Sequence, residues 1–264
     1  MATVLRRLAA IPVLLATGAI LGGCGGHGST PTGTTGSTSS TGTEAPDAHP
    51  KHAGSGTSRT KAQALAFAHA VNLRATDVPG FASSHQPAHH RESSAEKRLS
   101  RELRKCVGSP GEATALVEAS SGEFERKGGL LSQSVSSQVT VDQSAALAKA
   151  ELARFASPRL RSCLSRYFAE LLTGLTIHGT RVSGVSTRYG SPPAPGTSGS
   201  FGLRVTAKLD FHSVQIPFYL DYLGFVHDSA AVSLRSIGTP VPFPAREEEQ
   251  LFSLLVERAE KHDG

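Results

Sequence analysis

A strict alternation of apolar and polar residues between Phe201 and Phe211 is the feature of the sequence that most constrains the fold. Successive side chains of a β-strand point to opposite faces of a sheet, so a period of two marks a strand with one buried face. This segment therefore predicts a half-buried strand. Its apolar set is Phe201, Leu203, Val205, Ala207, Leu209 and Phe211, and its polar set is Arg204, Thr206, Lys208 and Asp210.

Further segments favour strands, and several are joined by short, turn-rich connections. The turn His227-Asp228-Ser229 separates two of them, and a Pro, Gly and Ser loop precedes Phe201. Consecutive strands with one polar face are typical of a single antiparallel sheet. The additional strands are predicted over residues 117–121, 131–141, 175–188, 214–222 and 231–237.

Five segments carry apolar residues at the spacing of an amphipathic helix. They are residues 61–71, the segment after the capping box Ser93–Glu96, the segment capped by Asp142, residues 158–174, and the segment after Pro244. Strands and helices that are segregated in this way predict an α+β fold, a single antiparallel sheet with helices packed on one face. The clearest helical stripe consists of Leu160, Cys163, Leu164, Tyr167, Phe168 and Leu171.

The start of the chain indicates where the protein is located. Arg6 and Arg7 precede an apolar run that ends at Leu21, which has the length of a signal-peptide core and is shorter than a permanent membrane span. The motif Leu21-Gly22-Gly23-Cys24 resembles the lipobox of bacterial lipoproteins. This resemblance implies acylation of Cys24 by diacylglycerol and palmitate-type chains, cleavage before Cys24, and an anchor on the extracytoplasmic face of the cell membrane. The alternative is an ordinary secretory signal with a chance cysteine.

Composition divides the rest of the chain in two. After Cys24 the sequence is dominated by Gly, Ser, Thr and Pro up to about Arg59, and such a segment cannot bury enough apolar surface to fold. We therefore predict a signal peptide over residues 1–23, a flexible tether over 24–59, and one extracytoplasmic domain over 60–264. Loss of Arg6 and Arg7 lowers the net charge from +5 to +3, and the charges are interspersed, so nucleic-acid binding is not expected.

Two cysteines are left once Cys24 carries lipid. Cys106 and Cys163 form an even pair in an oxidising compartment, and each lies on the apolar stripe of a separate predicted helix. This favours a Cys106–Cys163 disulfide. Metal binding by two distant cysteines without a Cys-x-x-Cys motif is the alternative.

The sequence gives little support for catalysis. Ser58-x-x-Lys61 and Ser94-x-x-Lys97 match the serine–lysine element of penicillin-binding enzymes, but no Lys-Thr-Gly accompanies them. His85, His89 and His90 form a cluster that could hold zinc or copper, although Pro87 and the spacing favour a solvated loop. We expect no enzyme activity, no cofactor and no metal site.

A second resemblance concerns the mature domain. Ala70-Val71-Asn72-Leu73 before Asp77-Val78-Pro79-Gly80 is similar to the openings of uncharacterised actinobacterial lipoproteins. A disulfide-linked helix pair, a meander of strands and a terminal helix resemble the extracellular sensor domains of actinobacterial serine/threonine kinases. This resemblance implies a sensor-like module and carries over no functional residues.

Two functions are consistent with these features. The first is a non-enzymatic binding module for an unknown envelope protein or cell-wall component, with the outward face around Arg204, Thr206 and Lys208, or the loop over residues 82–91, as the contact surface. The second is a carrier of a lipid or other apolar ligand, whose pocket would be lined by residues such as Leu203, Phe211, Phe218 and Phe168.

Overall fold

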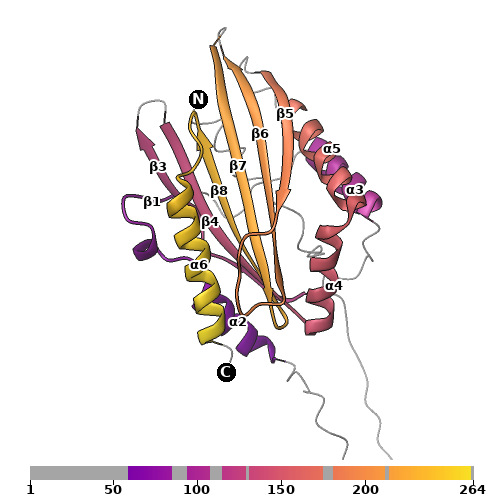
Figure 1. The fold of residues 1–264 in the computed structure, drawn as a ribbon, viewed down its shortest axis with the longest axis vertical. Helices are drawn as coiled ribbons and strands as arrows, with labels where there is room; N and C mark the ends of the chain where they lie inside the picture. Colours follow the sequence, from indigo (N-terminus) through magenta and orange to yellow (C-terminus); the bar gives the residue numbers. More distant parts are fainter. Residues whose placement is uncertain are drawn as a thin grey trace, which may run out of the picture.

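The computed structural model describes residues 59–84, 94–107, 115–128, 131–174, 181–211 and 214–262. Within them, eight antiparallel strands form one sheet (Figure 1). The strand order is β1-β3-β4-β8-β7-β6-β5, and β2 also pairs with β4. The strands are β1 Ala82–Ser83, β2 Ala115–Ser120, β3 Phe124–Gly128, β4 Leu131–Asp142, β5 Arg181–Gly190, β6 Gly199–Phe211, β7 Val214–His227 and β8 Ala230–Thr239.

Strands β2 and β3 together behave as one interrupted strand along one edge of β4. The first half of β4 pairs with β3 and the second half with β2, in a single antiparallel direction. The sequence predicts β2 and β4 but misses β3, whose polar residues Glu125, Arg126 and Lys127 hide the alternation. Strand β1 lies within the predicted loop over residues 82–91, and residues 85–91 of that loop lie outside the described ranges.

The meander β6–β7–β8 is the centre of the sheet. The alternation in β6 is confirmed, because Leu203, Val205 and Leu209 are buried while Arg204 and Lys208 are exposed. The predicted turn joins β7 to β8 through Asp228 and Ser229, and Asp228 has the left-handed φ of 50° that a two-residue hairpin requires.

Pro217 is tolerated inside β7 because β8 does not pair with β7 at that residue. The ladder between β7 and β8 begins at Tyr219, so β7 extends past its neighbour at Pro217. A missing backbone donor costs little where a strand has an unpaired edge.

Five α-helices and one 3₁₀ turn complete the described part of the chain. They are α2 Lys61–Val71, the turn η1 Ala75–Asp77, α3 Ser94–Val107, α4 Ala145–Ala156, α5 Pro158–Gly174 and α6 Ala245–Lys261.

Two details differ from the expectations for these helices. Ser144, and not Asp142, caps α4, because Asp142 still belongs to β4, where it pairs with Ala115. The apolar residue Leu65 of α2 is 43% exposed, and Ala64 occupies the buried position of the helix instead. The predicted cap Ser93 of α3 lies outside the described ranges.

The helices cover both faces of the sheet. Helices α4 and α5 pack with β5, β6 and β7 on one face, and α3 packs on α5. On the other face, α2 packs with β2 and β4, and α6 packs with β7 and β8. In β7, Tyr222 lies in the first core and Phe225 lies in the second, because side chains three residues apart point to opposite faces. The α+β class with one antiparallel sheet is confirmed, but the helices, expected on one face, lie on both.

Each face therefore has its own hydrophobic core. Burial of one such Leu or Phe side chain contributes about 2 kcal/mol relative to leaving it in water. The first core includes Leu164, Phe168, Leu203, Phe218 and Leu220, and the second includes Phe67, Val139, Phe225, Leu234 and Leu255.

Candidate functional site

The predicted disulfide is present. Cys106 near the end of α3 and Cys163 in α5 are bonded across 57 residues of sequence, with their Cα atoms 6.0 Å apart. Cys163 is buried and Cys106 is half-buried, and Arg166 Nη2 donates a 3.1 Å hydrogen bond to Cys106 Sγ. The bond fastens α3 to the outer side of α5, which already packs on the sheet. Cys24 and the cluster His85, His89 and His90 lie outside the described residues.

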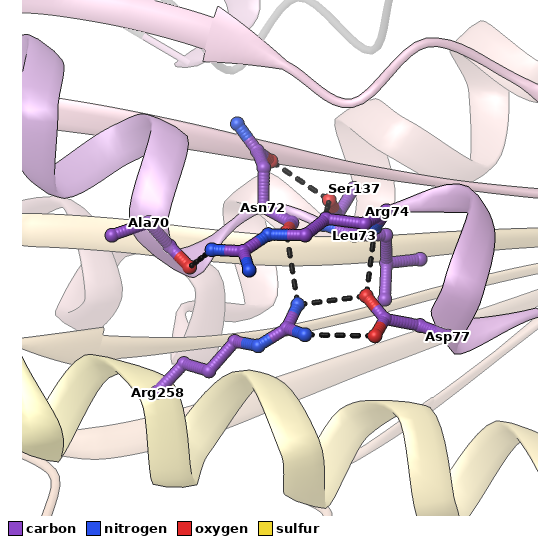
Figure 2. Close-up of polar contacts among 7 residues, drawn as sticks. All are labelled: Ala70, Asn72, Leu73, Arg74, Asp77, Ser137 and Arg258. Carbon is purple, nitrogen blue, oxygen red and sulfur yellow. Dashed lines mark hydrogen bonds and ion pairs between the residues drawn. The ribbon is translucent and has the colours of Figure 1, made fainter.

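The motif from Ala70 to Gly80 has a structural role (Figure 2). Ser137 on β4 donates to Asn72 Oδ1 at 2.7 Å, and its Oγ accepts from the backbone N–H of Leu73 at 2.8 Å. Asp77 accepts from the backbone N–H of Arg74 and from both terminal nitrogens of Arg258 in α6. The motif therefore joins α2, η1, β4 and α6, and these contacts account for its polar residues without a ligand.

The residues that the sequence nominates as a binding surface lie on a part of the sheet that none of the described helices covers. In Figure 1, α6 crosses β4 and β8, and it also contacts β7, whereas β5 and β6 have no helix in front of them. The loop between β5 and β6 reaches only one end of this part of the sheet, where Ala194 packs against the second core. We call this surface the open sheet face. By register and burial it consists of Arg181, Ser183, Ser186, Arg188, Arg204, Thr206, Lys208, Asp210 and Tyr219.

Hydrogen bonds between neighbouring strands order the hydroxyl groups of the open sheet face. The hydroxyls of Ser186 and Thr206 lie 2.7 Å apart, and Ser183 donates to Asp210 Oδ2 at 2.9 Å. These pairs restrain the side chains between the cations. The result is a polar surface with ordered hydroxyl groups, and its β5 edge is interrupted by a register shift between Ser183 and Ser186.

The charge of the open sheet face is mainly positive. Arg181, Arg188 and Lys208 are exposed, and none of them forms an ion pair with an acidic side chain in the described ranges. The side chain of Arg204 is 44% exposed, but it already forms an ion pair within the protein. Its Nε and Nη2 donate hydrogen bonds to the Asp221 carboxylate at 2.5 and 2.9 Å. Three cations are therefore available to a partner.

A buried acidic pair borders the open sheet face beneath α6. Asp221 on β7 and Glu248 in the first turn of α6 are both buried, and Arg204 Nη2 lies 4.0 Å from Glu248 Oε2. Ser236 on β8 donates a hydrogen bond to Glu248. Burial, followed by the negative charge of Asp221, raises the pKa of Glu248 to about 7.

The sequence did not indicate this acidic pair. Asp221 falls on an outward strand position, and Glu248 lies in the first turn of α6, where an acidic side chain complements the helix dipole. Asp221 does face away from the first core, but α6 covers that position. The pairing of β6 with β7 could have indicated the contact between Arg204 and Asp221, because these two residues lie directly opposite each other in that register.

The residues expected to line a carrier pocket are tightly packed. Phe168, Leu203 and Phe218 are at most 3% exposed and belong to the first core. The side chain of Phe211 lies outside what the structure describes. The core on this face of the sheet is filled at the place where the carrier hypothesis required a pocket.

The described ranges contain neither a cluster of metal ligands nor a helix that could span a membrane. There, no group of three or more His, Cys, Asp and Glu side chains is arranged to hold a metal ion. Every helix in the same ranges is too short or too polar to cross a lipid bilayer. Of the serine–lysine elements, Ser58 lies outside the described residues and Lys61 begins α2, while Ser94 and Lys97 both lie in the first turn of α3.

Comparison with known proteins identifies no family. No family model matches the chain, and no curated protein matches it. Among solved structures, the extracellular domain of PknH from Mycobacterium tuberculosis matches weakly, at 14% sequence identity and a TM-score of 0.29, over 67% of this chain and 100% of that chain. A superposition this loose carries no argument about the structure or the function of this chain.

Proposed function

We propose that the protein is a membrane-anchored extracytoplasmic lipoprotein whose domain is a non-enzymatic binding module for an anionic partner in the cell envelope. The observation that carries this proposal is the open sheet face, on which Arg181, Arg188 and Lys208 have no acidic partner in the described ranges. A surface of one charge sign raises the local concentration of oppositely charged groups and steers their approach. Its three exposed cations, spread over β5 and β6, suit an extended anion or an acidic protein face.

The anchor is supported by the sequence around Cys24. A diacylglycerol on its thiol would supply two acyl chains, which is what stable anchoring to a bilayer requires. A tether of about 35 flexible residues has a root-mean-square reach of roughly 30–35 Å. Such a tether would hold the domain at a high effective concentration relative to envelope components without fixing its orientation.

A non-catalytic role is supported by how the polar groups are arranged. Catalysis needs reactive groups that converge on a site where a substrate can enter. The buried acidic pair, Asp221 and Glu248, is already bonded to Arg204 and Ser236. These contacts support a role in fastening α6 to the sheet.

Titration with soluble polyanions tests the binding proposal. The mature protein, in nanodiscs of zwitterionic lipid, is titrated with poly-glutamate and with polyphosphate, and neutral dextran serves as the uncharged comparison. We expect saturable binding of at least one polyanion that weakens as salt is raised, because exposed charges are screened beyond about 8–10 Å at 0.1–0.15 M salt. The double variant R188E/K208E should weaken binding by at least about tenfold.

The matched control is K97E/R101E on α3. It reverses one lysine and one arginine, both exposed, on the opposite face of the sheet. This control should bind as the unmodified protein does. If R188E/K208E and K97E/R101E lost polyanion affinity equally, net charge alone would govern binding. The open sheet face would then have no specific role.

A further inference from the structure

A groove lies between α4 and the end of the sheet, on the face opposite the open sheet face. Its volume is about 320 Å³, and one side is open to solvent. One wall is α4, with Lys149, Leu152, Ala153 and Phe155, and the other is formed by the ends of β5 and β6. Ligand pockets usually have volumes of about 300–1,000 Å³, so this groove has room for a small molecule and is too small for a diacyl lipid.

The floor of the groove is aromatic. The rings of Phe155 and Phe201 are stacked with their centroids 4.0 Å apart, and both side chains are only half-buried. Gly224 on β7 makes this possible, because a Cβ at that position would come within 2.2 Å of the Phe201 ring. Behind the two rings lies a smaller cavity of about 40 Å³, which shares Leu152, Phe155 and Phe201 with the groove. An apolar body can therefore rest on rings that the protein leaves partly uncovered.

The rim of the groove is positive. Lys149 and Arg161 are exposed and line the groove, and no acidic side chain lines it. Arg161 is held in place, because its Nε donates to the backbone oxygen of Phe155 at 3.4 Å and its guanidinium lies 5.3 Å from the centre of the Tyr189 ring. The terminal nitrogens of Arg161 and the ammonium of Lys149 form no hydrogen bond or ion pair within the described ranges.

An acidic group does lie nearby, on the far side of the rings. Glu151 lines the smaller cavity, where burial and the charge of Asp142 raise its pKa. Phe155 and Phe201 lie between that cavity and the groove, since both cavities use these rings as a wall. The groove itself therefore presents cations and an apolar floor.

We propose that this groove binds a small amphiphilic anion, with its carboxylate or phosphate beside Lys149 and Arg161 and its apolar part on Phe155 and Phe201. The cations select against neutral and cationic analogues, and the aromatic floor selects against small hydrophilic anions. The site is independent of the open sheet face, which lies on the other side of the sheet and uses other residues.

The probe for the test is 4-phenylbutyrate, which has one ring, one carboxylate and little affinity for membranes. Its binding to the full mature chain in nanodiscs is measured by saturation-transfer NMR, with empty nanodiscs as the blank. We expect saturable binding in the range from high micromolar to millimolar, because a ligand of this size gains about 0.3 kcal/mol or more per heavy atom. The neutral 4-phenylbutanol should bind at least fivefold more weakly, and 4-phenylbutylamine should not bind.

Variants on α4 locate the probe. Ala153 is exposed and lines the groove, whereas Ala150 is exposed on the same helix and does not line it. A153W should fill the groove and abolish binding, and A150W should leave binding unchanged. K149Q/R161Q should weaken binding by about tenfold, and K149R should retain it.

Three outcomes would overturn the proposal: no saturable binding of 4-phenylbutyrate, equal binding of its neutral analogue, or binding that survives A153W. The variant R188E/K208E should still bind 4-phenylbutyrate, and A153W should still bind polyanions. Failure at the groove and failure at the open sheet face are therefore separate results.

Discussion

Arg258, in the last turn of α6, forms a bidentate ion pair with Asp77, which lies 181 residues earlier in the chain. The two hydrogen bonds are 2.8 and 2.7 Å long, and a third, of 3.0 Å, runs from Arg258 to the backbone oxygen of Asn72 (Figure 2). The side chains of Arg258 and Asp77 are only 15% and 9% exposed. The pair is thus shielded from water and ties the C-terminal helix to the first helix of the domain.

The variant R258Q should lower the free energy of unfolding by about 3 kcal/mol, because it leaves the Asp77 carboxylate buried without its partner. The control on the same helix is K261Q, which breaks the one-turn pair between Lys261 and Glu257, whose side chains are 66% and 57% exposed. That change should cost less than about 0.5 kcal/mol. Urea unfolding measures both variants, and equal losses would contradict a structural role for the Arg258–Asp77 pair.

The buried Glu248 carboxyl should make the stability of the domain depend on pH. Its pKa is about 7 in the folded protein against 4.5 when exposed, so between these values the folded chain keeps a proton that the unfolded chain releases. Stability from this group is therefore fully present below pH 4.5, falls as the pH rises to about 7, and is then constant. A shift of this size corresponds to a loss on the order of 3 kcal/mol.

The variant E248Q isolates this effect, since it cannot ionise and leaves every other group in place. The unfolding free energy of E248Q relative to the unmodified protein should rise by up to about 3 kcal/mol between pH 4.5 and pH 7.5. Urea titrations at four pH values in this range would measure the difference. A difference that does not change with pH would show that Glu248 is ionised throughout the range.

The Cys106–Cys163 disulfide closes a loop of 57 residues. A cross-link of this length stabilises a domain by about 4 kcal/mol through restriction of the unfolded chain. The double variant C106S/C163S should therefore unfold at a lower urea concentration than the oxidised protein, and reduction of the unmodified protein should reproduce that shift. An unchanged midpoint after complete reduction would contradict a stabilising role for the bond.

Cys24→Ser tests the anchor. The thiol of Cys24 is the acylated group under the proposed function, so the variant should carry no lipid and should no longer be recovered with the membrane fraction. Mass spectrometry of the purified protein measures the acyl chains, and fractionation measures its distribution. Full recovery of the unacylated variant with membranes would refute the lipobox assignment.

Local patterns predicted most of the elements correctly. The alternation in β6 and the stripe on α5 each depend on a few neighbouring residues, so they can be read from sequence. Neighbouring residues do not determine which face of the sheet each helix covers, because that choice depends on how strands distant in sequence are aligned. One signal was available: the run from Tyr222 to Val226 is continuously apolar, which is typical of a strand buried on both faces.

The open sheet face was predicted through Arg204, Thr206 and Lys208, and its neighbours on β5 follow from the register. The burial of Asp221 and Glu248 was not predicted, because it depends on where α6 crosses the sheet. The groove beside α4 was also missed. It arises where α4 meets the ends of β5 and β6, and no single segment of sequence carries that information.

Photo-crosslinking in living cells tests whether the open sheet face is the surface through which the tethered domain binds its partner. Benzoylphenylalanine is placed at Ser186, which is exposed on this face, or at Arg101 on α3, on the opposite side. We expect a discrete crosslinked product from position 186 that is absent from position 101 and is lost in R188E/K208E. The same product from both positions, or none from position 186, would contradict it.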